Sequence, residues 1–275
     1  FGSRPLEGRW ALGAQPRHAE GPLLSLSCRA LWPTRRECRR MAASALRADG
    51  RASNQMRPPQ AELRPLLRAD GSARFKLGRS AVVAAVYGPR EPKSRAREIF
   101  DRATLDVLVR PRVGMPGPEE RQLEGHLQRQ FEHIVILEQY PRTQITVILQ
   151  VCSADGAVGA VAGNAAFLAL LDAGVAMRAT ALSVSVGVCL GKQEIDPAVF
   201  LLDPTEAEER ACDSVITVSV DGCREELLSS LSAGAALDAV AWTTCATAAS
   251  KACKVLEAFL RMALQKRMEA FLKPA

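Results

Sequence analysis

The stretch ADGAVGAVAGNAAFLALLDAGVAMRA, residues 154–179, constrains the fold more than any other part of the chain. A turn at Asp155-Gly156 leads into a run of mostly alanine, glycine and leucine, and Gly174 follows it as a helix-ending residue. Because alanine and glycine have little or no side chain, a sheet or a second helix can approach such a helix closely. The sequence therefore predicts a helix from Ala160 to Leu171 at the crowded centre of the fold.

Alternating apolar patterns predict strands around this helix. Residues 73–77 and 81–87 indicate an antiparallel pair joined across Gly78-Arg79, and the second strand, which contains Val-Val-Ala-Ala-Val, is typical of a strand buried on both faces. Further apolar periods predict strands at 103–109, 144–151, 181–190, 199–202 and 214–220, and helices at 123–135 and 239–271. Two rounds of strands followed by helices predict an α+β fold of duplicated strand–helix units, with mixed sheets and packed helices.

Positive charge is concentrated at the start of the chain. The first forty residues hold eight arginines and three glutamates, so they carry +5 of the formal net charge of +6. We expect residues 1–45 to be a disordered or wrongly included extension, since Met41 opens MAASALRADGR like a natural start; an organelle transit peptide is the alternative. Residues 46–275 are predicted to form one domain, whose nucleic-acid contacts must then be local patches.

Cysteine and histidine usage argues against a metal site. The eight cysteines include no C-x-x-C pair and the three histidines are scattered. We therefore expect buried thiols in a reducing compartment rather than disulfides or a zinc site. The chain also lacks a run of about 18 apolar residues, so no membrane span is expected.

Several motifs occur in a characteristic order. They are ADGRASNQMRP (48–58), DGSARFKLGRSAVVAAVYGPRE (70–91), ATLDVLVRPRVGMPG (103–117) with PRTQITVILQV (141–151), the alanine-rich stretch 154–179, and LLDPTEAEE (201–209). Over residues 46–270 this order resembles the ribonuclease PH family. VYGP (86–89), LDAGVAMRA (171–179) and LDPT (202–205) resemble most closely the ring subunits of the eukaryotic exosome, in particular its ribosomal-RNA-processing component.

The resemblance implies a phosphate site at the start of the alanine-rich helix. In active members, inorganic phosphate attacks the last phosphodiester of an RNA 3′ end, and a Gly-Thr-Arg triplet after the D-G turn holds the phosphate. Here that triplet is Ala157-Val158-Gly159, so every side-chain ligand is missing. From this segment an anion would be bound only by the backbone N–H groups of Gly156, Ala157, Val158 and Gly159. Arg121 or Arg129, on the preceding helix, would supply a further ligand.

The resemblance also implies catalytic carboxylates in an acidic run. That run comprises Asp203, Glu206, Glu208, Glu209 and Asp213. Asp213 aligns with one catalytic carboxylate and is a vestigial candidate, whereas Ala207 replaces the other. The alternative is a solvated acidic turn that begins a helix. A divalent ion and inorganic phosphate are expected as cofactors only if the chain is active.

Arginines are the main candidates for RNA contact. Arg51 and Arg57 belong to the opening motif, and Arg90, Lys93, Arg95 and Arg97 cluster after the first hairpin. Such a cluster can bind a phosphate backbone without base specificity. A solubilising loop is the alternative, because few aromatic side chains accompany it.

Three functions are compatible with these features. The first is a structural, RNA-binding exosome subunit in a hetero-oligomeric ring with other ribonuclease PH-like chains, without phosphorolytic activity of its own. The second is an active phosphorolytic 3′-to-5′ exoribonuclease, and the third is hydrolysis at the acidic run. The expected partners are ring subunits and single-stranded RNA, with a homodimer when isolated and no membrane; the expected compartments are nucleus, nucleolus and cytoplasm.

Overall fold

The computed structural model describes residues 47, 49–92, 98–190 and 199–272. The predicted extension, residues 1–45, lies outside the described residues, as do Lys93, Arg95 and Arg97. In the described part of the chain, no helix is both long enough and apolar enough to cross a membrane.

The first sheet is mixed and has five strands. In spatial order they are β1 (Pro59–Leu63), β2 (Gly71–Leu77), β3 (Ser80–Arg90), β5 (Gln144–Ser153) and β4 (Thr104–Arg110). The β4–β5 pair is parallel and the other pairs are antiparallel. The predicted hairpin is confirmed: Leu77 pairs with Ser80 across the Gly78-Arg79 turn, and most of β3 is buried.

The second sheet is antiparallel and has four strands. In spatial order they are β7 (Val199–Leu202), β6 (Ala181–Cys189), β8 (Ser214–Asp221) and β9 (Leu227–Gly234). Every residue of β6 is buried. The short helix α4 (Glu206–Ala211) connects β7 to β8, and its N-cap Thr205 forms a capping box with Glu208.

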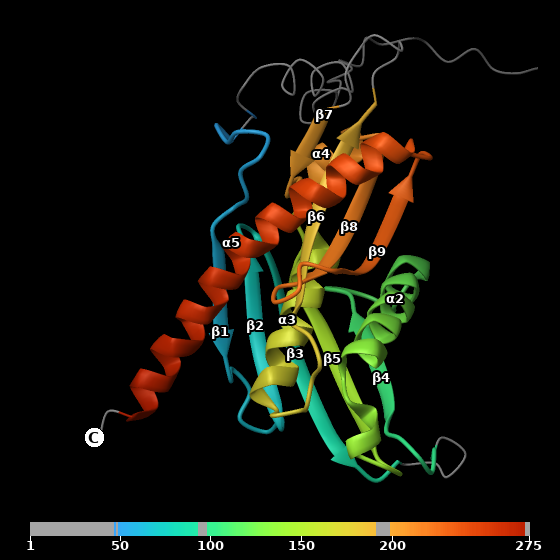
Figure 1. The fold of residues 1–275 in the computed structure, drawn as a ribbon, viewed down its shortest axis with the longest axis vertical. Coiled ribbons are helices and arrows are strands. Elements are labelled where there is room, and N and C mark those ends of the chain that lie inside the picture. The colour runs from blue at the N-terminus through green and yellow to red at the C-terminus, as the bar shows by residue number, and fades with distance from the viewer. Residues whose placement is uncertain (1–46, 48, 93–97, 191–198, 273–275) are drawn as a thin grey trace, which may run out of the picture. The chain divides into compact units, whose positions relative to one another are not determined.

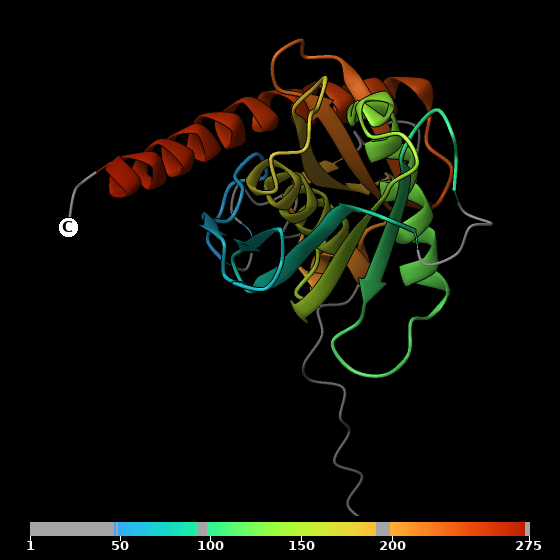
Figure 2. The same cartoon turned by 90° about the horizontal axis from the view of Figure 1, so that it is seen from below.

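Helix α3 (Val158–Asp172) lies between the two sheets and packs against β2 and β3 on one side and β6 on the other (Figures 1 and 2). Both approaches depend on glycine. A Cβ on Gly71 of β2 would lie 2.4 Å from the carbonyl oxygen of Ala169, and a Cβ on Gly163 of α3 would lie 2.6 Å from the Ser183 hydroxyl of β6. The predicted crowded centre is therefore confirmed.

Two further helices cover the sheets. Helix α2 (Pro118–Ile134) packs against β4, and η2 (Leu137–Gln139) follows it. Helix α5 (Ala239–Leu272) crosses β6 and β8, and an ion pair of 3.4 Å between Arg267 and Asp172 ties its later turns to the end of α3. The α+β fold with packed helices is as predicted, and the first of its two sheets is mixed. Strands β1 and β9 were not expected. Strand β9 reads Leu-Leu-Ser-Ser-Leu-Ser-Ala-Gly and is largely exposed, so it carries little alternation to recognise.

Candidate functional site

The start of α3 is pressed against the connection between β7 and α4. Gly156 has φ +76°, and a Cβ there would lie 2.4 Å from the carbonyl oxygen of Pro204. Ala157, the N-cap of α3, has a left-handed backbone with φ 54° and is buried. The D-G turn is thus fixed by sterics, because only glycine fits at the first of these positions.

A carboxylate of the chain itself occupies the end of this helix. The Ala157 N–H donates a hydrogen bond of 2.7 Å to Oε1 of Glu209, which α4 carries. The positive end of a helix dipole and its free N–H groups favour such an anion. Burial raises the pKa of Glu209, against the opposing influence of the Ala157 N–H and of Arg57. The place where the resemblance puts phosphate therefore already holds a negative group.

The two arginines predicted as further phosphate ligands are both on α2, which contacts the first turn of α3 through Leu123. A Cβ on Gly159 would lie 3.2 Å from Oγ1 of Thr217 and 3.6 Å from Leu123, so α2 passes the first turn of α3. Arg121 is an exposed residue of α2 two positions from Leu123. Arg129, also exposed, donates through its Nε to the carbonyl oxygen of Gly125 on its own helix, at 3.0 Å. Phosphate binding at residues 156–159, Arg121 and Arg129 stays a prediction.

Beside the helix end lies a buried ion pair that joins the opening motif to the acidic run. Arg57 donates to Asp203 from its backbone N–H at 2.9 Å, from Nε at 2.8 Å and from Nη2 at 2.6 Å. Its Nη1 donates to the carbonyl oxygen of Asp155 at 2.7 Å. The side chains of Arg57 and Asp203 are only 6% and 1% exposed. This arrangement favours a structural role for Arg57, and RNA contact by it stays a prediction.

Two more arginines extend the network. Arg47 donates from Nη2 to the carbonyl oxygen of Leu202 at 2.6 Å and lies 3.7 Å from a carboxylate oxygen of Glu208. Arg51, predicted to bind RNA, pairs with Asp49 at 3.0 Å and with Asp203 at 3.5 Å. The sequence offered no sign of Arg47, because the carbonyl oxygens of Leu202 and Asp203 that its guanidinium contacts are 155 and 156 positions away.

Asp213, the predicted catalytic carboxylate, bonds to the end of β6 rather than to the start of α3. Its Oδ2 accepts a hydrogen bond of 2.9 Å from Leu190 N–H, and its own N–H donates to the carbonyl oxygen of Val188 at 3.0 Å. These bonds hold the end of β6 beside the start of β8. Among the residues that the structure describes, no group of three or more histidine, cysteine, aspartate or glutamate side chains is placed to hold a metal ion. A catalytic role for Asp213 stays a prediction.

Of the predicted RNA-binding cluster, Arg90 is the described member. Its side chain is 56% exposed, pairs with Asp70 at 2.9 Å, and lies over the Tyr87 ring at 5.3 Å from the centroid. A hollow of about 280 Å³ adjoins these residues on the first sheet, lined also by Glu91, Gln144, Thr146 and Ile148. A cation beside an aromatic ring at a hollow is an arrangement suited to an unpaired base and its phosphate.

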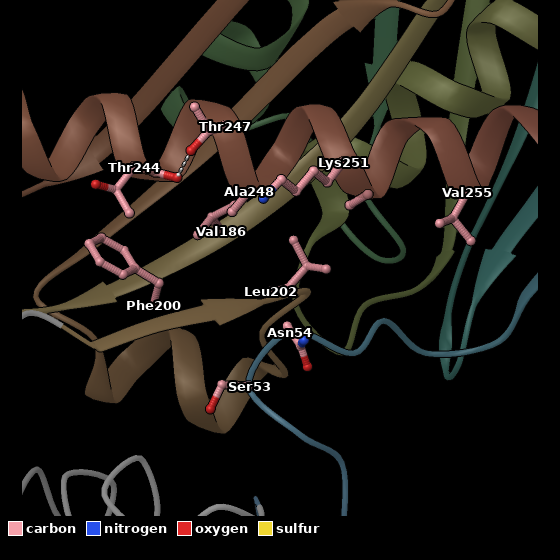
Figure 3. Close-up of a pocket in the computed structure, with 11 residues that line it drawn as sticks. Ser53, Asn54, Val186, Phe200, Leu202, Thr244, Thr247, Ala248, Lys251 and Val255 are labelled. Carbon is pink, nitrogen blue, oxygen red and sulfur yellow. Dashed lines mark hydrogen bonds between the residues drawn. The ribbon is translucent and has the colours of Figure 1, made fainter.

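A larger hollow of about 480 Å³ lies under α5 and shares no residue with the predicted site (Figure 3). Val186, Phe200 and Leu202 form its floor, and α5 lines one side with threonine, alanine, lysine and valine. Ser53 and Asn54, which follow Arg51 in the opening motif, line its edge. Among the lining residues Lys251 is the charged one, so the hollow is mainly apolar.

Comparison of the chain with known protein families and their members agrees with this fold. Models of the 3′ exoribonuclease family match residues 55–176 (domain 1) and 180–251 (domain 2). The exosome complex exonuclease RRP46 homolog of rice is 38% identical over 168 residues, which is 61% of this chain and 68% of the relative. The exosome complex component Rrp41 of Pyrobaculum calidifontis is 40% identical over 162 residues, which is 56% of this chain and 66% of the relative.

Solved structures give the same result. The crystal structure of rice Rrp46 superposes with a TM-score of 0.73 and 34% identity, covering 80% of this chain and all of that one. The Archaeoglobus fulgidus exosome with RNA bound to the active site gives a TM-score of 0.68 at 20% identity, covering 82% of this chain and 97% of that one, which supports the fold. The two-sheet architecture around α3, the ordered motifs and these matches together show that the chain belongs to the ribonuclease PH family of 3′ exoribonucleases.

Proposed function

We propose that this chain is a structural and RNA-binding subunit of an exosome-type ring, in which it takes part in 3′-to-5′ RNA processing and degradation without phosphorolytic activity of its own. Its similarity to exosome components of rice and of archaea supports the assembly. The partners are other ribonuclease PH-like subunits and single-stranded RNA. The processes are ribosomal RNA processing and messenger RNA turnover, in the nucleus, nucleolus and cytoplasm.

The observation that carries the proposal is the start of α3. Ala157, Val158 and Gly159 offer no hydroxyl or guanidinium there, and the Ala157 N–H donates to Glu209. A phosphate dianion at this place has to displace a carboxylate, and residues 157–159 offer it backbone donors alone. Both effects weaken phosphate binding, and phosphate is the attacking group in phosphorolysis.

RNA contact is assigned to the surface around Arg90. Its exposed guanidinium beside Tyr87 supplies one cation and one aromatic face, which is what a single strand needs for contact without base specificity. The side chains of Arg51 and Arg57 are only 11% and 6% exposed and pair with Asp49, Asp155 and Asp203, whereas the pair of Arg90 with Asp70 lies at the surface. Their contribution to RNA binding is therefore indirect, through the shape of the opening segment.

The test is an RNA degradation assay on the full chain. Labelled single-stranded RNA is incubated with Mg²⁺, with and without inorganic phosphate, and released nucleoside diphosphate and monophosphate are separated. We expect RNA binding without release of either. Phosphate-dependent diphosphate release would instead establish the alternative, an active phosphorolytic exoribonuclease. Monophosphate release would establish hydrolysis at the acidic run, and both results contradict the proposal.

A gain-of-function variant sharpens the assay. Ala157→Gly, Val158→Thr and Gly159→Arg restore the family triplet, and Glu209→Gln removes the competing charge. Because a Cβ at residue 159 lies 3.2 Å from Thr217, that side chain must shift by a few tenths of an ångström. Tighter binding of inorganic phosphate by this variant than by the unchanged chain is the result that the proposal predicts, because the variant restores the phosphate ligands while Ala207 still stands in place of one catalytic carboxylate. Co-purification with other ribonuclease PH-like subunits tests the ring assembly separately.

A further inference from the structure

Two cysteines meet where β6 ends. Gly187 and Cys189 point to the same face of β6, because side chains alternate along a strand. A Cβ on Gly187 would lie 2.8 Å from Sγ of Cys212. The missing side chain at Gly187 therefore leaves the space that the Cys212 thiol fills, next to Cys189.

The two thiols are within reach of a covalent bond. Their sulfur atoms lie 3.3 Å apart, whereas a disulfide bond is about 2.0 Å long. Val188 pairs with Ser214 in the antiparallel ladder, and the two hydrogen bonds of Asp213 to Val188 and Leu190 continue that register around Cys189. Because these bonds hold the flanking backbone, the disulfide requires rotation of the two side chains to close the remaining distance.

The surroundings keep the pair together. Cys189 and Cys212 are 4% and 8% exposed, and they form a small apolar cluster with Leu201, separate from the main core. Cys212 is the C-cap of α4. Of the two residues Cys212 is the more exposed, so we assign to it the first contact with a small oxidant.

We propose that Cys189 and Cys212 form a modification site that a peroxide oxidises reversibly to an intramolecular disulfide. In the first step the Cys212 thiol attacks hydrogen peroxide, which gives a sulfenic acid and one water. In the second step the Cys189 thiol displaces hydroxide from that sulfur, forming the S–S bond and a second water. Two thiols and one peroxide thus give one disulfide and two waters, and a dithiol reductant reverses the change.

The bond ties the end of β6 to the end of α4. Helix α4 carries Glu208, which lies close to Arg47, and Glu209, which accepts from Ala157. The bond closes a loop between residues 23 positions apart and so restricts the unfolded chain. We expect the oxidised protein to melt at a higher temperature, by on the order of 5 °C.

The other described cysteines provide internal comparisons. Cys245 and Cys253 are buried on α5, and burial raises their pKa values to about 11 and about 12, so they report how buried thiols outside the proposed pair respond to the oxidant. Cys152 and Cys223 are exposed and react with any oxidant. Selective loss of the Cys189 and Cys212 thiols is therefore distinguishable from general oxidation.

The experiment uses the full chain with Cys28, Cys38, Cys152 and Cys223 replaced by serine. The protein is treated with hydrogen peroxide, denatured, alkylated and digested, and the peptides are weighed. We expect one linked peptide pair, lighter than the two reduced peptides by the mass of two hydrogens, which dithiothreitol separates. Adding Cys212→Ser removes this pair and the rise in melting temperature, and leaves Cys245 and Cys253 alkylated.

Three results overturn the proposal. The first is that Cys189 and Cys212 are both still alkylated after treatment with a peroxide concentration that oxidises Cys152 of the unsubstituted chain. The second is that they are recovered as separate sulfinic acids. The third is that one of them is linked to Cys245. If the serine variant does not fold, the same peptide mapping on the unsubstituted chain gives the same decision, because the linked peptide is identified directly.

Discussion

Replacing Asp203 by asparagine tests whether the buried ion pair holds the candidate site together. Asp203 is fully buried and accepts three hydrogen bonds from Arg57. Asparagine has the same shape and tolerates the left-handed backbone at this position, φ 52°, so the substitution removes the charge with little backbone strain. Arg57 is then left buried with a weaker partner, Asp155, at 3.5 Å.

The expected loss is large for a single substitution. Removing one partner of a buried ion pair costs about 3–5 kcal/mol, because the other charge stays desolvated. Since Asp155 remains close to Arg57, we expect a value at the lower end, about 3 kcal/mol. For a domain of this size that corresponds to a fall in melting temperature of about 6–12 °C.

Urea unfolding of Asp203→Asn, followed by circular dichroism, measures this difference. The matched control is Glu206→Gln, which breaks the exposed ion pair between Glu206 and Arg210 on α4 and should cost less than about 1 kcal/mol. If Asp203→Asn loses no more than the control, the pair does not hold the opening segment. The reasoning about Arg57 would then be refuted.

Three further predictions follow from single contacts. Gly163→Ala places a methyl 2.6 Å from the Ser183 hydroxyl, which forces α3 away from β6, and should lower the unfolding free energy by about 1–3 kcal/mol. Burial raises the pKa of Glu209 above its unfolded value, so ionisation of this carboxyl costs stability at neutral pH. As pH falls through the raised pKa toward 4.5, the wild type should therefore gain stability relative to Glu209→Gln. Urea unfolding of both proteins at each pH measures this difference. Arg90→Ala should weaken binding of single-stranded RNA and reduce the slope of log affinity against log salt by about one, measured by fluorescence anisotropy.

Matched controls exist for two of these. Gly125→Ala on α2 places its methyl 3.8 Å from Arg129, so it should stabilise the helix by up to about 1 kcal/mol; equal loss at residues 125 and 163 would contradict the close approach of α3. Arg261→Ala on α5 removes a similarly exposed arginine paired with Glu257. If Arg261→Ala lowers RNA affinity as much as Arg90→Ala does, the loss reflects the net charge of the protein rather than an RNA-binding site at Arg90.

Most of the fold could be predicted because periodicity and small residues report directly on packing. The β3 run without polar breaks predicted a strand buried on both faces, and the alanine-rich stretch predicted the crowded centre; both are confirmed by β3 and α3. Strand β9 was missed for the opposite reason. Its exposed, uncharged serine and leucine residues carry little pattern, and its position depends on pairing with β8.

The site was less predictable because its contacts join distant segments. Arg57 and Asp203 were each singled out, one as an RNA ligand and one as part of an acidic run, but their separation of 146 positions hid the pairing. An arginine in a motif indicates charge, and its partner decides whether that charge faces solvent or the interior. The motifs of the resemblance therefore identified these residues and could not assign their roles.

Glu209 shows how the lost ligands and the acidic run are connected. The first N–H groups of a helix need acceptors, and the dipole makes an anion the preferred one. In an active relative, the resemblance implies that phosphate fills this role during catalysis. Here Glu209 provides a permanent acceptor, held in place by the capping box that starts α4. A helix start satisfied in this way does not depend on phosphate for its stability, which is compatible with Ala157-Val158-Gly159 at the positions of the family triplet. It follows that restoring the triplet alone should increase phosphate affinity less than restoring it together with Glu209→Gln. If the two variants bind phosphate equally well, the site merely lacks ligands; if the combined variant binds more tightly, Glu209 competes with phosphate for the helix start.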